Sequence, residues 1–221
     1  AFGLTFFDGL IRFAFYPQLA DELSGRNLDP DQLLADGNFA PILAAMFDTN
    51  GLNLAALPKG LIAFHSEGDD CRTPVAEHLL EAVQTVLSAD NLARLHFTVS
   101  PEHQVEFERE AAAVAGKYSD TSFDITFSHQ SPSTDTIAAD VDNQPFRDAD
   151  GRLVFRPGGH GALLKNLNEL DAHLVFVKNI DNVLPPAAAE ASNVEKRVLG
   201  GYALQLADKR NAAVRSLHAN V

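Results

Sequence analysis

The sequence contains one cysteine and no tryptophan, and its basic residues are scarce. The single thiol, Cys71, excludes an internal disulfide, which suits a reducing compartment, so we expect a cytoplasmic protein. The 17 Lys and Arg residues are outnumbered by 30 Asp and Glu, the formal net charge is −13, and no basic run is interleaved with aromatic residues. This balance argues against binding to nucleic acid or to an anionic membrane surface.

Long apolar runs and targeting patterns are absent as well. No apolar stretch approaches the roughly 20 residues that a membrane-spanning helix needs. The first residues lack the basic start and small-residue cleavage pattern of a secretory signal. The chain also lacks an initiator methionine and opens on a helical apolar pattern, so we expect the N-terminal part of a longer protein to be missing.

Two common catalytic chemistries lack their signatures in this sequence. The eight histidines form no H-x-x-x-H pair and have no cysteine partner set, which argues against a zinc site. The sequence has no G-x-S-x-G motif, so the nucleophile elbow of a serine hydrolase is missing. An acidic protein that handles phosphates would instead use local cations, backbone amides and a divalent metal.

The sequence pattern changes near residue 57, from helical segments only to strands that alternate with helices. Residues 1–56 show only helical patterns, with a break at Pro17 and with Asp29 and Pro30 as the N-cap and first residue of a helix. We interpret them as a helical block packed on a core formed by residues 57–221. In that core, strands are expected at 61–64, 94–99, 123–127, 153–155 and 174–180, alternating with helices, of which the last spans about 192–217. This alternation predicts an α/β fold with a mostly parallel sheet.

A glycine-rich loop and a strand-terminal acid are the strongest functional signals. Pro157 to Leu164 places three glycines, Gly158, Gly159 and Gly161, just before a helical pattern, so a bare backbone can approach a ligand there. The predicted strand after it ends in Asp181. Ligands of open parallel sheets collect beyond the carboxyl ends of strands, so Asp181 is placed to hold a metal or a hydroxyl, although such a residue is also often a helix cap.

Several motifs in the same order resemble known nucleotidyltransferases. They are Leu57-Pro58-Lys59, Arg72 to His78, Phe127 to Gln130, Asp150-Gly151, Pro157 to Leu163 and Asn179 to Asn182. The first two resemble the Pro-Lys and Pro-Leu-[Ile/Leu]-Glu motifs of sugar nucleotidyltransferases. The others are similar to the Phe-x-Gln, Pro-x-Gly-x-Gly-Gly and Val-Asp-Asn motifs of UDP-N-acetylhexosamine and UDP-glucose pyrophosphorylases. Over about residues 4–215, the chain also resembles a bacterial family known as domain of unknown function 4301.

This resemblance implies a Rossmann-like core of the glycosyltransferase-A type, with residues 1–56 as a helical insertion. The implied activity is Mg²⁺-dependent transfer of a nucleotidyl group from a nucleoside triphosphate to a sugar phosphate, with UTP favoured by analogy. A binding protein for nucleotide sugars or sugar phosphates that does not catalyse transfer is the alternative, and a protein whose acidic surface and helical block serve assembly is a third. The sequence leaves the nucleotide, the sugar and the oligomeric state open.

The residue roles follow from the same resemblance. Lys59 would neutralise phosphate and Asp181 would hold Mg²⁺, and both are candidate catalytic residues. Other candidates are Gln130, Gly158, Gly159, His160 and Gly161 for the nucleotide, and Arg72 and Asn182 for the substrate.

Each role has a plainer alternative. Lys59 could be a solvated lysine, Gln130 could satisfy loop backbone, His160 could cap or pack, and Arg72 could pair with Asp69 or Asp70. The sequence also departs from the pattern, because the motif G-x-G-x-[TS]-R does not precede Lys59 and no second metal carboxylate can be matched near the C-terminus.

Overall fold

We describe a computed structural model that covers residues 2–67 and 70–219. The N-terminal helices are α1 (Phe2–Asp8), α2 (Tyr16–Gly25), α3 (Pro30–Ala35) and α4 (Ala40–Phe47), with the 3-10 turn η1 (Leu10–Arg12) between α1 and α2. The predicted break at Pro17 lies earlier, in residues 9–15, and Pro17 itself occupies the first turn of α2. Asp29 caps α3 as predicted, because its side chain accepts hydrogen bonds from the amides of Asp31 and Gln32.

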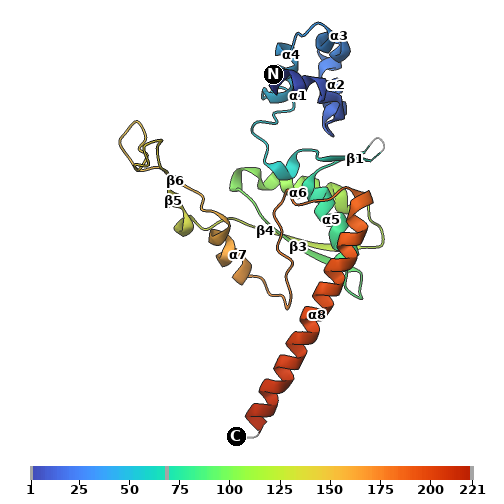
Figure 1. The fold of residues 1–221 in the computed structure, drawn as a ribbon, viewed down its shortest axis with the longest axis vertical. Coiled ribbons are helices and arrows are strands. Elements are labelled where there is room, and N and C mark those ends of the chain that lie inside the picture. The colour runs from blue at the N-terminus through green and yellow to red at the C-terminus, as the bar shows by residue number, and fades with distance from the viewer. Residues whose placement is uncertain (1, 68–69, 220–221) are drawn as a thin grey trace.

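These helices enclose a hydrophobic cluster of their own at one end of the molecule (Figure 1). Leu19, Leu23, Ile42 and Ala45 are completely buried in it. The thiol of Cys71 donates a hydrogen bond to the carbonyl oxygen of Ala14, at 2.9 Å, and so ties this block to the chain that follows. The boundary at residues 56 and 57 stays a prediction, although the cluster draws almost all of its buried members from the N-terminal side of it.

The second core forms around one parallel strand pair. Strand β3 (Leu92–Thr98) pairs in parallel with β4 (Ser122–Ser128), in a register that joins Leu92 to Ser122 and Thr98 to Ser128. The connection runs through η3 (Pro101–His103) and α6 (Gln104–Ala115), and α5 (Pro74–Thr85) precedes β3. Apolar side chains of α5, α6 and β3 form the second hydrophobic cluster, with Val75 and Leu79 completely buried.

The other face of this strand pair is polar. His96 lies between Thr126 and Ser128, with each ring nitrogen 2.8 Å from a hydroxyl oxygen. The hydroxyl of Ser128 also accepts a hydrogen bond from the buried side-chain amide of Asn166, which lies in α7 (Leu164–Asn168). Among the described residues each sheet has two strands, so the mostly parallel Rossmann-like sheet stays a prediction.

The remaining elements extend from this centre. Strand β1 (His65–Glu67) pairs antiparallel with β2 (Asp70–Arg72), and β5 (Thr136–Ile137) pairs antiparallel with β6 (Phe155–Arg156) in an outlying hairpin (Figure 1). Short 3-10 turns are η2 (Lys59–Leu61), η4 (Pro132–Thr134) and η5 (His160–Leu163). Helix α8 (Pro186–Ala219) ends the described chain. No helix in the described parts combines the length and apolarity needed to cross a membrane.

Two strand predictions are wrong. Leu61 is the last residue of the 3-10 turn η2, residues 62–64 form no strand, and β1 begins only at His65. Residues 174–180 form no strand, although their side chains alternate as in one. Phe176 packs on Gly200 of α8, Lys178 pairs with Glu81 of α5, and Ile180 joins the second cluster. Side-chain contacts with two helices therefore hold this extended segment in place of a neighbouring strand.

Candidate functional site

Lys59 and Asp181, 122 positions apart in the sequence, meet in the structure. The ammonium nitrogen of Lys59 lies 2.7 Å from Oδ2 of Asp181, and the two side chains are 67% and 37% exposed. Exposed ion pairs of this kind contribute little to stability, because water and salt screen both charges. The pair can therefore open at small cost when a charged ligand arrives.

The close approach of the two segments depends on Gly60. A Cβ atom at this position would lie 2.7 Å from the Phe107 ring and 3.0 Å from Cγ1 of Ile180. Only a hydrogen atom fits there, so η2 can pack directly on α6 and on the residue that precedes Asp181. Pro58 caps η2 and sets the chain direction into Lys59. The close packing at Gly60 and the fixed backbone of Pro58 thus hold Lys59 next to Asp181.

The backbone before Asp181 is fixed by α5. Nε2 of His78 lies 3.1 Å from the carbonyl oxygen of Ile180, and donation to this oxygen requires the Nε2–H tautomer. Burial lowers the pKa of His78, and the nearby positive charge of Lys178 adds to this, so the ring is neutral at neutral pH. Sequence patterns gave no role to His78, although it lies one helical turn before Glu81 on the same face of α5.

Electrostatics favour the ionised form of Asp181. The hydrogen bond from Lys59 lowers the pKa of this carboxyl group, the amide of Asp181 itself adds to the effect, and the charge of Lys59 contributes further. The structure thus brings Lys59 and Asp181 together, while His160 is exposed at the start of η5 in the glycine loop.

Gln130 and Gly158 form a second group. With its amide oriented to satisfy donors and acceptors, Gln130 accepts a hydrogen bond from the Gly158 amide at 2.7 Å and donates to the Gly158 carbonyl oxygen at 3.3 Å. A Cβ atom at Gly158 would lie 2.7 Å from the carbonyl oxygen of Thr134. The glycine loop is thus fastened to the end of β4, and the plainer role considered for Gln130, satisfying loop backbone, is present in the structure.

Gly159 and Gly161 differ from Gly158 because a Cβ atom at either would meet no atom within 4 Å. Packing therefore does not require glycine at these two positions. Open space beside both residues is what a loop needs if its backbone is to approach a ligand.

A cavity of about 260 Å³ opens beside Gln130. Its lining includes His129, Ser131, Lys165, Asn166 and Glu169. Asn166 donates to Ser128 Oγ and to the carbonyl oxygen of His129, and its own Oδ1 is buried without a hydrogen-bond partner among the described residues. The sequence gave no signal for Asn166 beyond its place in the helix after the glycine loop.

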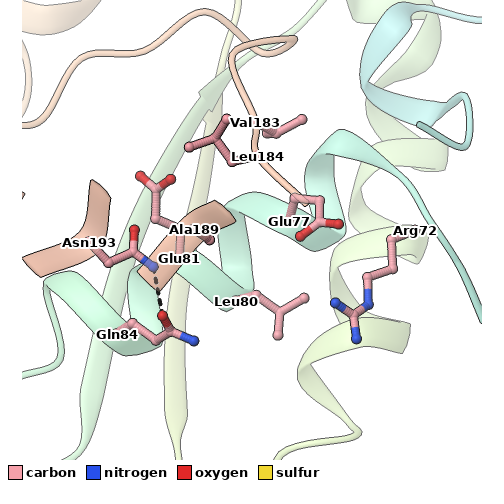
Figure 2. Close-up of a pocket in the computed structure, with 9 residues that line it drawn as sticks. All are labelled: Arg72, Glu77, Leu80, Glu81, Gln84, Val183, Leu184, Ala189 and Asn193. Atoms are coloured by element: carbon pink, nitrogen blue, oxygen red, sulfur yellow. Dashed lines mark hydrogen bonds between the residues drawn. The ribbon is translucent and has the colours of Figure 1, made fainter. Parts of the chain in front are cut away.

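The two remaining predicted residues lie elsewhere in this region. Arg72 lines a smaller cavity of about 60 Å³ between α5 and α8, with Glu77 and Leu184 (Figure 2). The predicted alternative pairing of Arg72 with Asp69 or Asp70 involves side chains outside the described part of the structure. Asn182 is exposed, and its amide closes a turn on the carbonyl oxygen of Asn179 at 3.0 Å.

Metal binding depends on how the His, Cys, Asp and Glu side chains are grouped. Within the described residues, no three His, Cys, Asp or Glu side chains gather closely enough to hold an ion by themselves. Asp181 can still serve Mg²⁺, because this ion is commonly held by one or two carboxylates together with substrate phosphates and water. The donor set therefore fits a metal that arrives with a nucleotide, and it does not fit a metal bound by protein alone.

Comparison with known proteins places the chain in one family. No curated protein and no solved structure matches it. One family model, described as a domain of unknown function (DUF4301), matches residues 1–221. The chain therefore belongs to the DUF4301 family.

Proposed function

We propose that this protein is a sugar-1-phosphate nucleotidyltransferase or the nucleotide-binding part of one. The observation that carries the proposal is the 2.7 Å contact between Lys59 and Asp181. The Pro-Lys motif resembles one of sugar nucleotidyltransferases, and the Asn-Ile-Asp-Asn motif resembles one of the pyrophosphorylases. The two motifs meet in space although they lie far apart in sequence. The proposed core is the Rossmann-like, glycosyltransferase-A-type fold implied by the same resemblance.

Nucleotidyl transfer requires alignment and charge neutralisation more than covalent chemistry by the protein. An oxygen of the sugar phosphate attacks the α-phosphorus of the nucleotide, and pyrophosphate leaves. Lys59, released from Asp181, lies against the developing negative charge. The open backbone at Gly159 and Gly161 receives the nucleoside, while Gln130 holds the loop in shape. Mg²⁺, when bound with the phosphates, neutralises their charge, and Asp181 is the protein ligand available to it.

The alternative is a protein that binds a nucleotide sugar or sugar phosphate without transferring it. This alternative is favoured because no three His, Cys, Asp or Glu side chains of the described chain gather into a group that could hold a metal ion. Enzymes that bind Mg²⁺ through a single carboxylate depend on substrate phosphates for the other ligands. Measurement of turnover, in addition to binding, separates the two functions.

Binding of UTP with Mg²⁺ should stabilise the protein. At about 100 times its Kd, the nucleotide should raise the free energy of unfolding by about 2.7 kcal/mol, and removal of Mg²⁺ should reduce the effect. Thermal-shift measurements with UTP, ATP, UDP-sugars and sugar phosphates test this and identify the preferred base. If none of these ligands shifts the unfolding temperature, the proposal is wrong.

Substitution of the ion pair should separate chemistry from binding. We expect Lys59→Ala to lower kcat far more than nucleotide affinity, because the cation meets charge that develops in the transition state. Asp181→Asn should remove the dependence of binding on Mg²⁺. Arg94 and Asp124 form a matched exposed pair at 3.5 Å, so Arg94→Ala and Asp124→Asn serve as controls and should change neither property. Equal losses of kcat and affinity in Lys59→Ala would mean that Lys59 only binds the nucleotide and does not meet charge that develops in the transition state.

A further inference from the structure

Helix α8 presents one face to the body of the protein and another to solvent. Asn193 donates a hydrogen bond to Gln84 of α5 at 2.6 Å, Lys196 pairs with Glu81 at 2.7 Å, and Gly200 receives the Phe176 ring. At about 100° per residue, these three positions share one side of the helix. The side of α8 opposite to these three residues does not face the body of the protein.

That opposite side carries an exposed stripe with a palindromic spacing. We define the α8 stripe as Glu195, Val198, Tyr202, Leu206 and Lys209. Successive members are three, four, four and three residues apart, so all five lie within about 40° of Tyr202 around the helix axis. Val198, Tyr202 and Leu206 are 67%, 57% and 47% exposed, and both charged residues are exposed as well.

The charges at the two ends of the α8 stripe have opposite sign. Glu195 precedes Tyr202 by seven residues, and Lys209 follows it by seven. If a second copy of the helix lies antiparallel with Tyr202 on the two-fold axis, Glu195 of each copy faces Lys209 of the other. Val198 then faces Leu206. A two-fold contact requires a surface that is complementary to itself, and this stripe is.

We propose that two copies of this chain associate through an antiparallel pairing of their α8 stripes. The C-terminal part of α8 extends well away from the rest of the molecule (Figure 1). A helical segment without tertiary contacts is only marginally stable in water, and apolar side chains at helical spacing are stabilised when they pack on a partner helix. The second copy supplies both the apolar cover and the opposite charges.

Sedimentation equilibrium of the 221-residue chain over a range of concentrations tests the pairing. The wild-type chain should form dimers, and Tyr202→Glu should make it monomeric because two like charges then meet at the axis. Leu204→Glu is the matched control, since Leu204 is 46% exposed but lies about 160° around the helix from Tyr202. This variant should stay dimeric. Circular dichroism shows whether each variant keeps its helix content.

Charge reversal tests the antiparallel register. Glu195→Lys alone and Lys209→Glu alone should each raise the dimer Kd about fivefold at low salt, because every dimer contains two such pairs. The double variant should return to the wild-type Kd. In a Cys71→Ser background, Tyr202→Cys should be joined by a short bismaleimide, and Leu204→Cys should not.

Three results would overturn the proposal. One is a wild-type chain that stays monomeric at every concentration. Another is dissociation of Leu204→Glu while Tyr202→Glu stays dimeric, which would place the contact on another face. The third is a double charge variant that is weaker than either single variant, which would exclude the antiparallel register.

Discussion

At the scale of single residues, glycines serve two different purposes in the candidate site. Gly60 and Gly158 are required by packing, because a Cβ atom at either position would lie 2.7 Å from a neighbouring atom. Gly159 and Gly161 have open space around them. The sequence shows four equivalent glycines, and the structure separates the two needed for packing from the two available to a ligand.

This difference predicts that two neighbouring substitutions affect different properties, one the stability and the other the binding of nucleotide. Gly158→Ala should lower the unfolding temperature, because the new methyl group meets the carbonyl oxygen of Thr134. Gly159→Ala should leave the unfolding temperature unchanged and should weaken nucleotide binding, if the proposed function is right. Thermal unfolding with and without UTP and Mg²⁺ measures both effects. A large loss of stability in Gly159→Ala would contradict the assignment.

At the scale of elements, a shared carboxylate joins three segments. Glu81 of α5 lies 2.6 Å from the Lys178 ammonium and 2.7 Å from that of Lys196 in α8. Burial would raise the pKa of Glu81, but hydrogen bonds and charge from both lysines outweigh it and the pKa is lowered. The pKa of Lys178 is lowered as well, because burial and the charge of Lys196 outweigh the attraction of Glu81. The carboxylate is therefore the partner whose charged form is stabilised.

Removal of this charge should loosen α8 and the segment before Asp181. Glu81→Gln should lower the free energy of unfolding by about 2 kcal/mol at neutral pH, since two charge-assisted hydrogen bonds are lost. The wild-type contribution is present above the ordinary pKa of 4.5 and is lost as the pH falls through the lowered pKa of the folded state. The variant should lack this part of the acid dependence.

Urea unfolding of wild type and Glu81→Gln at several pH values measures both effects. Glu102→Gln, at an exposed position, is the control and should behave as wild type. If Glu81→Gln and wild type lose stability in parallel below pH 4.5, another acid accounts for the dependence.

At the scale of the whole molecule, burial is divided between two clusters. Leu19 is completely buried in the N-terminal cluster and Leu79 in the cluster around β3 and β4. Few contacts join them, of which the hydrogen bond from Cys71 to Ala14 is one. Such an arrangement favours separate unfolding of the two parts.

Calorimetry of two cavity variants tests this division. Leu19→Ala and Leu79→Ala should each cost about 3 kcal/mol, because each leaves a cavity in a closed core. We expect Leu19→Ala to lower one unfolding transition and Leu79→Ala to lower another. A single transition that both variants shift equally would show that the two clusters unfold together, and the predicted boundary at residue 57 would then be wrong.

The sequence determined the elements whose signals are local. Asp29 caps α3 as predicted, and Thr73 caps α5 in the same way, because a side chain and the amides it caps are within three residues of each other. The strands near 94–99 and 123–127 were also predictable, since alternation of side chains is a local pattern. Family membership was predictable for a similar reason, because ordered motifs survive in the sequence itself.

Only the tertiary structure decided how distant segments meet. The apolar run from Leu174 to Val177 has the composition of a strand, but Leu174 and Phe176 lie against Gly200 of α8, and the next residue, Lys178, pairs with Glu81 of α5. No strand lies beside this run among the described residues. The pairing of Lys59 with Asp181 depends on the missing side chain of Gly60 and on Ile180, which no local pattern relates. Helix and turn preferences act over a few residues, whereas packing selects among contacts more than a hundred residues apart.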